Sequence, residues 1–257
     1  MYRFRHAVAF LILPFLAVIA PAQEKQTQPA KQAVTKDVDP LAMKVLSAVD
    51  QPLQAAQTYT FKALVSEEEL ATNGQILTFF HTVDVTVQRP DKIHLVFRGR
   101  GEEVDFYGSG GNITMYSPDV KLYSTMSGKN TIDATLDDLI AKGADIPIAP
   151  FLRSDSYKRA EAHVITAYVI GRVQVFGQEV HQLAFTAADA DWQLWVVGGP
   201  DPRIVRAEIV NKKLEGKPRT SIQFLDWNLS PTIAADEFTF TKPAGAQEIS
   251  VMVEGGK

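Results

Sequence analysis

The sequence predicts a mainly β protein of the α+β class, a highly curved antiparallel sheet of about eleven strands whose concave face two or three helices cover. Three observations predict this class. Apolar and polar residues alternate with period two through most of the chain. One amphipathic helix precedes the strands, and one helical insertion interrupts them. Strands and helices therefore do not alternate, as they do in proteins with a parallel sheet.

Residues 1–22 have the pattern of a secretory signal peptide. Arg3 and Arg5 precede an apolar run over residues 7–19, and Ala20-Pro21-Ala22 follows. The run has about 13 residues, whereas a helix that crosses the bilayer needs about 20, so a retained membrane helix is the weaker alternative. We expect cleavage after Ala22 and a protein that works in the periplasm.

Composition restricts the class further. The chain contains no cysteine, so it has neither a disulfide nor the acylated cysteine of a lipoprotein. The net charge is −4 and becomes −6 when Arg3 and Arg5 leave with the signal peptide. An acidic chain lacks the basic surface that nucleic acids require, so nucleic acid is excluded as a partner.

The domain organisation is predicted from the distribution of apolar residues. Residues 23–39 contain almost no large apolar side chain, which predicts a disordered linker. Residues 40–250 are predicted to form a single domain, and residues 251–257 a disordered tail. The domain opens with a helix, since Asp39-Pro40 is a typical helix start and Leu41, Val45, Val49 and Leu53 follow at helical spacing. This helix is expected to end near Ala56, with a kink or restart at residues 50–52 as an alternative.

The strands follow the helix. Their alternating apolar residues are Tyr59, Phe61, Ala63 and Val65, then Leu77, Phe79, His81, Val83, Val85 and Val87, then Ile93, Leu95 and Phe97. Shorter strands are expected over 103–107, 112–116 and 120–124, and further strands over 163–176, 180–186, 192–197, 204–210 and 221–229. Turn residues such as Asn73-Gly74 predict antiparallel hairpins between them.

A helical insertion is predicted in the middle of the chain. Asn130 or Thr131 is a suitable N-cap for a stripe of Ile132, Leu136, Leu139 and Ile140, and Gly143 ends it. The proline-rich segment 146–152 is predicted to form a single helical turn at most. These helices have to cover the concave side of the sheet, and whatever they leave uncovered becomes a cavity.

The search for catalytic residues favours a protein that is not an enzyme and has no metal or cofactor. Residues 108–111 form a glycine-rich loop between strands, whereas a nucleophile elbow needs a strand-to-helix turn. The histidines are scattered without metal-ligand spacing, and His181, which shares a strand face with Leu183, is more simply explained by a hydrogen bond within the sheet. The acidic run 67–69 is interpreted as a solvated charged edge near a hairpin end.

Several strings of residues resemble a known family. They are Arg89-Pro90-Asp91-Lys92, Tyr116-Ser117-Pro118, Asp133 to Leu139 with Pro147, His181-Gln182-Leu183-Ala184-Phe185, Asp191-Trp192-Gln193-Leu194-Trp195 and Phe238-Thr239-Phe240 before Pro243-Ala244-Gly245-Ala246. The chain resembles a family of predicted periplasmic proteins of unknown function, which itself resembles the LolA and LppX group of outer-membrane lipoprotein-sorting proteins. The resemblance implies a half-barrel closed by a helical lid, over a hydrophobic cavity that takes up acyl chains. It transfers no gating or ligand residue to this chain, and the missing cysteine rules out an acyl anchor.

These observations predict a non-enzymatic periplasmic carrier or binding protein. Its ligand would be a lipid, an acyl chain or a lipoprotein, exchanged with a membrane-bound donor or acceptor. Trp192 and Trp195 are expected on opposite faces of one strand. The residues predicted to line the cavity are Phe61, Phe79, Val83, Leu95, Phe97, Leu136, Leu139, Ile140, Phe151, Trp192 and Leu194. The alternative is a structural module of the cell envelope, its cavity filled by side chains, that docks a partner through the sheet edge.

Overall fold

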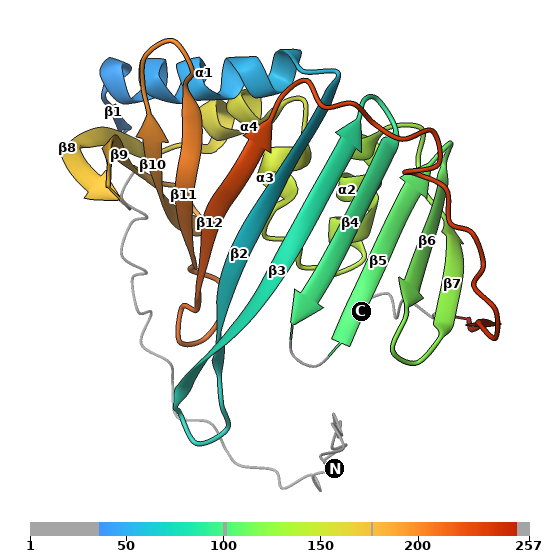
Figure 1. The fold of residues 1–257 in the computed structure, drawn as a ribbon. Coiled ribbons are helices and arrows are strands. Elements are labelled where there is room, and N and C mark those ends of the chain that lie inside the picture. The colour runs from blue at the N-terminus through green and yellow to red at the C-terminus, as the bar shows by residue number, and fades with distance from the viewer. Residues whose placement is uncertain (1–35, 100–101, 176, 251–257) are drawn as a thin grey trace, which may run out of the picture. The chain divides into compact units, whose positions relative to one another are not determined.

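The structure is a computed structural model, which describes residues 36–99, 102–175 and 177–250. Within these residues one sheet of thirteen strands is accompanied by four helices (Figure 1). The long strands are β2 (Thr58–Leu70), β3 (Ile76–Gln88), β4 (Lys92–Gly99), β5 (Glu102–Ser109), β6 (Asn112–Ser117), β7 (Leu122–Ser127), β8 (Thr166–Val175), β9 (Gln178–Thr186), β10 (Ala190–Val197), β11 (Arg203–Asn211) and β12 (Arg219–Asn228). The predicted fold class is confirmed: eleven long strands are joined by two strands of two residues each, β1 (Asp37–Val38) and β13 (Gln247–Glu248).

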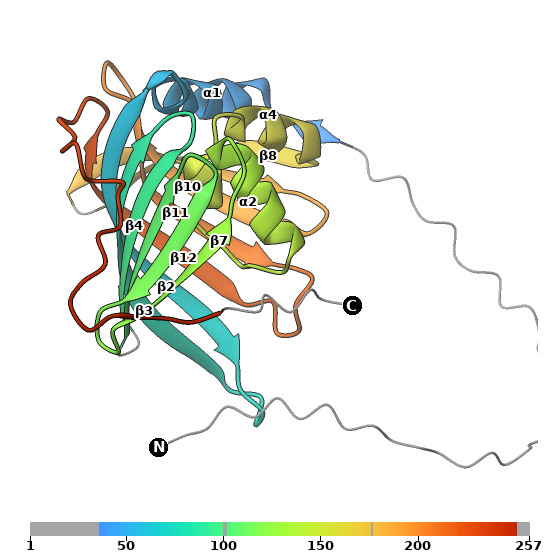
Figure 2. The ribbon, with the colours of Figure 1, turned by 90° about the vertical axis from the view of Figure 1, so that its right-hand side faces the viewer.

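The sheet consists of two antiparallel meanders that meet in the middle: the first contains strands β2 to β7, and the second contains strands β8 to β12. Its strand order is β1-β8-β9-β10-β11-β12-β2-β3-β4-β5-β6-β7-β13, so β12 pairs with β2 and joins the second meander to the first. Figure 2 shows that the sheet curves around the helices, which all lie on its concave side. The curvature follows from the twist that accumulates between neighbouring strands.

The period-two pattern correctly predicts which side chains are buried. Tyr59, Phe61, Ala63 and Val65 of β2 are buried, while the residues between them are half-buried or exposed. The same alternation holds for Val83, Val85 and Val87 of β3. Cross-strand pairing places these rows side by side on the concave face, where they form the centre of the core.

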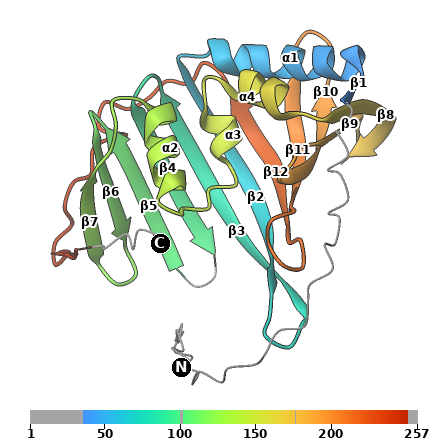
Figure 3. The same ribbon diagram turned by 180° about the vertical axis from the view of Figure 1, so that it is seen from behind.

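The helices are α1 (Pro40–Ala55), α2 (Ile132–Ala141), α3 (Ala149–Leu152) and α4 (Ser156–His163), and Figure 3 shows them in front of the concave face. The Asp39 side chain caps α1 by accepting a hydrogen bond from the Leu41 N–H at 2.8 Å. This helix continues through Pro52 without a break, because its buried face, which includes Leu46 and Val49, packs on the sheet. No helix of the described residues is long and apolar enough to cross a membrane.

Several segments differ from the sequence-based prediction. The structure has four helices among the described residues where two or three were expected, and the strand expected over 120–124 is Leu122–Ser127. The strand expected from residue 163 begins only at Thr166, since α4 occupies residues 156–163. This helix buries none of its residues fully, so it lacks the apolar stripe that would have revealed it. The predicted linker 23–39 ends earlier than expected, because Asp37 and Val38 pair in parallel with β8. The predicted signal peptide (1–22) and tail (251–257) lie outside the described residues.

The convex face is covered by the C-terminal segment 229–249, which we call the strap. It runs from β12 across the outer side of β4, β5, β6 and β7 (Figure 1) and ends in β13, which pairs in parallel with β7. The Phe240 ring lies 5.8, 5.4 and 5.1 Å from the rings of Tyr107, Tyr116 and Tyr123. The strap thus covers the aromatic side chains of β5, β6 and β7 on the convex face, whereas Leu64, Phe80 and Leu225 farther along this face stay exposed.

Candidate functional site

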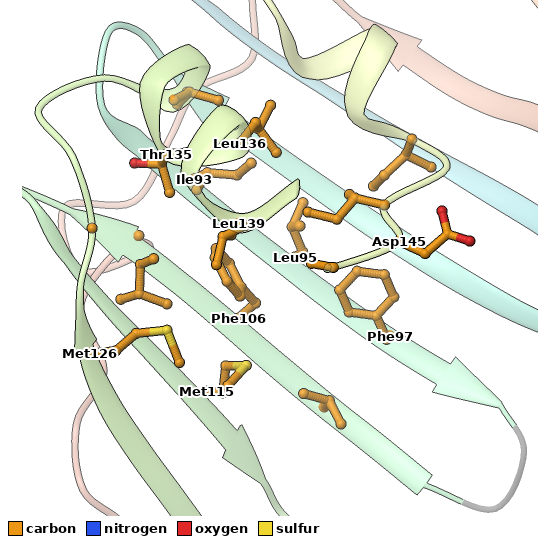
Figure 4. Close-up of a pocket in the computed structure, with 18 of the residues that line it drawn as sticks. Ile93, Leu95, Phe97, Phe106, Met115, Met126, Thr135, Leu136, Leu139 and Asp145 are labelled. Carbon is orange, nitrogen blue, oxygen red and sulfur yellow. The ribbon is translucent and has the colours of Figure 1, made fainter. Parts of the chain in front are cut away.

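A strongly apolar cavity of the concave face lies between α2 and the first meander, and we call it the main cavity. Its volume is about 630 Å³. Figure 4 shows the side chains of both the sheet and α2 directed into it. Its apolar lining includes Ile93, Leu95 and Phe97 of β4, Val104 and Phe106 of β5, Ile113 and Met115 of β6, Met126 of β7 and Leu136 and Leu139 of α2. Such an apolar hollow suits a lipophilic ligand.

The strand register builds the floor of this cavity. Leu95, Phe106 and Met115 are direct cross-strand partners on β4, β5 and β6, so their side chains form one row on the same face. Gly108 stands opposite Ile93, where an added Cβ would lie 2.8 Å from the Ile93 Cγ2 atom. The glycine therefore lets the isoleucine occupy the floor.

Helix α2 forms the roof. Its N-cap, Thr131, accepts a hydrogen bond from the Ala134 N–H at 3.1 Å, as the sequence predicted for this residue or its neighbour. Leu136 and Leu139 face the cavity, whereas Ile140 is 44% exposed. Ile140 was predicted to line the cavity and does not, because one residue rotates a helix by about 100° and carries the side chain to the outer face.

Ionisable groups stand at the margin of the main cavity. The Nδ1 atom of His81 lies 3.7 Å from the Glu67 Oε2 atom, and both side chains are lining residues. Glu67 thus faces the cavity and not a solvated edge, because odd-numbered residues of β2 point to the concave side. Lys142 and Lys129 pair with Asp138 at 2.7 and 3.4 Å, and the hydrogen bond from Lys142 lowers the Asp138 pKa.

A smaller cavity of about 290 Å³ lies on the other half of the concave face, and we call it the second cavity. It is enclosed by α1, α3, α4 and strands β10 and β11, and its apolar lining includes Leu46, Phe151, Tyr157, Trp192, Leu194, Ile204 and Ile209. The Trp192 ring stacks on Phe185 with centroids 3.7 Å apart. The Arg206 guanidinium lies 5.6 Å from the centroid of the Trp195 ring. Trp195 lines neither cavity.

Four aromatic side chains of β2, α3 and β12 pack against one another, and we call them the aromatic plug: Phe61, Phe151, Phe224 and Trp227. None of them lines the main cavity. The Phe61 ring lies 5.5 Å from Phe224 and 4.4 Å from Trp227, and Phe151 meets Phe224 at 4.6 Å. No residue lines both cavities. The main and second cavities are therefore separate hollows, and Phe224 and Trp227 line a third hollow of about 700 Å³ beside α1, whose lining also includes Asp201, Arg203 and Asp226.

The residues predicted to line one cavity lie at several different places in the structure. Leu95, Phe97, Leu136 and Leu139 line the main cavity, and Phe151, Trp192 and Leu194 line the second. Phe61 belongs to the plug and Val83 to the core beside it, so neither lines a cavity of the concave face. Phe79 is half-buried on the part of β3 beyond His81 and lines neither cavity.

Sequence reasoning missed the lining residues on β5, β6 and β7. Phe106 and Met115 lie on strands that the sequence located, and period-two alternation from Val104 onward would have identified them. The described residues contain no group of three or more side chains that could hold a metal ion. His181 lines neither cavity and lies beside Gly198, whose added Cβ would be 3.6 Å from the His181 ring.

The fold and the cavities define a half-barrel with an apolar interior under helices. The chain belongs to the family described as "Predicted periplasmic protein (DUF2092)", whose model matches residues 42–252. The family predicted from the sequence motifs is thus confirmed. No curated protein matches the sequence.

Solved structures that are similar to this chain include two mycobacterial proteins and one protein from Nitrosomonas europaea. LppX from Mycobacterium tuberculosis is 13% identical with a TM-score of 0.49, and the match covers 76% of this chain and 100% of LppX. LprF from Mycobacterium bovis is 15% identical with a TM-score of 0.49, over 81% of this chain and 99% of LprF. A LolA superfamily protein from Nitrosomonas europaea is 10% identical with a TM-score of 0.32, over 77% and 97% of the two chains.

Proposed function

We propose that the protein is a non-enzymatic periplasmic binding or carrier protein that holds a lipid or another lipophilic ligand in the main cavity. The observation that carries this proposal is the cavity of about 630 Å³, whose floor and roof are apolar side chains. The family description as periplasmic and the leader sequence support the compartment. The ligand would be exchanged with a membrane-bound donor or acceptor, or would be the acyl part of a lipoprotein.

The physical reason for such a carrier is the cost of exposing hydrocarbon to water. Each buried methylene gains about 0.8 kcal/mol, so a long acyl chain gains on the order of 10 kcal/mol when it leaves water. Leu95, Phe106 and Leu139 offer the apolar contacts that replace the membrane interior. Ionisable groups stand at the margin, where a polar headgroup can remain hydrated.

The experiment is a binding measurement on the delipidated protein with a fluorescent fatty acid, together with native mass spectrometry of protein purified from the periplasm without detergent. Leu139→Trp fills the cavity from the roof, and we expect it to weaken binding at least about tenfold. Ile140→Trp is the matched control, because it adds the same side chain on the exposed face of the same helix. The proposal fails if the protein neither carries nor takes up lipid, or if Leu139→Trp binds as tightly as Ile140→Trp.

A second candidate function is a structural module that docks a partner through a sheet edge. The edge strand β8 favours it, because Tyr168 and Ile170 are 48% and 51% exposed there. Among the described residues, β1 pairs only with Thr166 and Ala167 of this strand. An exposed apolar edge can accept a further strand. A protein with no bound lipid and no lipid uptake, together with loss of a co-purifying partner in Ile170→Asp, would support this function over the carrier.

A further inference from the structure

We propose that the main cavity is a single-chain site: it takes a lipid with one long acyl chain, such as a fatty acid or a lysophospholipid, and does not accommodate the second chain of a diacyl phospholipid. This inference rests on the proposed function and names its ligand class. It is carried by the size of the main cavity and by the plug that separates it from the second cavity.

Volume is the first argument. Benzene fills an engineered protein cavity of about 150 Å³, which corresponds to about 25 Å³ per carbon atom. At that density the main cavity, of about 630 Å³, holds about 25 carbon atoms. One chain of about 16 to 18 carbons fits, whereas two such chains would need about 800 Å³ or more.

The second argument is that the main cavity does not continue into the second cavity. The second cavity, of about 290 Å³, lies on the same concave face and would extend the main cavity if the two were connected. Ile148 faces the main cavity, and Phe151, one helical turn along, faces the second and packs on Phe224 at 4.6 Å. The end of an acyl chain bound in the main cavity would therefore contact the segment that includes α3, with the aromatic plug behind that segment.

The third argument is that hydrogen bonds hold α3 in place. The Tyr59 hydroxyl lies 3.2 Å from the carbonyl oxygens of Phe151 and Leu152. The Arg89 guanidinium donates to the carbonyls of Leu152 at 3.2 Å and Arg153 at 3.1 Å. Tyr59 is fully buried, so these bonds are protected from water.

An ion pair ties the same segment to the roof of the main cavity. The buried Arg153 guanidinium lies 2.8 Å from the Asp137 carboxylate of α2. The separating segment is thus bonded to β2, to the end of β3 and to α2, three elements around the main cavity. A ligand that pushed α3 aside would have to break all of these contacts, so the two cavities stay separate when the first is filled.

The test uses the delipidated full-length mature protein and competition against a single-chain fluorescent fatty acid. The competitors are palmitate, a lysophosphatidylcholine with one sixteen-carbon chain, and dipalmitoyl phosphatidylcholine. We expect the first two to displace the probe and the diacyl lipid to be at least about tenfold weaker. Native mass spectrometry should show one single-chain lipid per protein.

The outcomes separate the inference from the proposed function. If the diacyl lipid competes as well as the lysophospholipid, the single-chain inference is wrong and the carrier function stands. If none of the lipids binds, the carrier function is wrong and the inference falls with it. Discrete binding of only the two single-chain lipids supports both.

The plug is tested separately by Phe151→Ala, with Phe151→Leu as the milder change. Opening the plug joins the cavities, so we expect the affinity for the diacyl lipid to rise toward that of the lysophospholipid. Phe240→Ala on the convex face is the control, because it truncates the same kind of side chain away from both cavities. Circular dichroism identifies which variants are folded, and a folded plug variant that still rejects the diacyl lipid would refute the role of the plug.

Discussion

The backbone N–H of Tyr157 donates a hydrogen bond to the Asp50 Oδ2 atom at 3.2 Å, so that a carboxylate of α1 caps the first turn of α4. The Ser156 hydroxyl donates to the Asp50 Oδ1 atom at 2.9 Å. The residue that precedes α4, Asp155, makes no capping bond with its side chain. Asp50 therefore links α1 to α4 beside the second cavity, and this contact requires its carboxylate to lie in a buried position.

The first prediction concerns the pH dependence of stability. Burial raises the Asp50 pKa above its ordinary value of 3.8, although the hydrogen bonds from Ser156 and Tyr157 oppose the shift. The native state then binds more protons than the unfolded state just above pH 3.8, so the contribution of Asp50 to stability falls as pH rises through that range. Asp50→Asn removes this titration. Urea unfolding at a series of pH values should show a shallower decline for the variant, and equal slopes would contradict the assignment.

A second prediction concerns the hydroxyl that holds α3. Tyr59→Phe leaves the ring in the core and removes the buried hydrogen bonds from its hydroxyl to the carbonyls of Phe151 and Leu152, together with the bond that it accepts from the Arg89 guanidinium at 3.5 Å. We expect a loss of about 1–3 kcal/mol in the free energy of unfolding. Tyr123→Phe is the matched control, because its hydroxyl contacts Glu248 at the exposed surface, and it should cost about 0.5 kcal/mol or less. Equal costs in chemical denaturation would show that the α3 contacts do not stabilise the fold.

The third prediction compares two glycines with similar backbone angles. Gly99 has φ +159° and Gly171 has φ +150°. A Cβ at Gly99 would lie 2.6 Å from the His81 Cβ atom and 2.7 Å from its Cα atom, whereas a Cβ at Gly171 meets nothing within 4 Å. Gly99→Ala should therefore destabilise the protein by about 1–3 kcal/mol more than Gly171→Ala. Thermal or urea unfolding of the two variants measures this difference, and a larger loss for Gly171→Ala would be the opposite result.

The fourth prediction separates the strap from the ligand site. Phe240→Ala removes the ring that contacts Tyr107, Tyr116 and Tyr123 on the convex face. We expect faster hydrogen exchange in the strap and in β5–β7, because local opening costs less once these contacts are lost. Binding of the fatty-acid probe should be unchanged, since Phe240 lines neither cavity. A weaker probe affinity with unchanged exchange would mean that the convex face shapes the cavity.

The sequence alone determined the fold class and most of the elements. Alternating residues such as Val83, Val85 and Val87 predict strands because side chains of a strand point to opposite faces in turn. Helices with a cap or an apolar stripe, such as α1 and α2, are predicted for the same kind of local reason. The cap of α4 comes from Asp50, which is more than a hundred residues away in the sequence. No local sequence pattern therefore predicts this helix.

Only the tertiary structure decided which apolar residues leave a space and which fill it. Phe61 and Leu95 belong to the same concave face, yet Phe61 packs against Trp227 in the plug whereas Leu95 lines the main cavity. Period two identifies the face of a strand but does not state which helix or aromatic side chain lies above a given residue. That depends on contacts between segments far apart in the chain, such as Phe151 with Phe224, and these contacts decide where the cavities of the concave face lie.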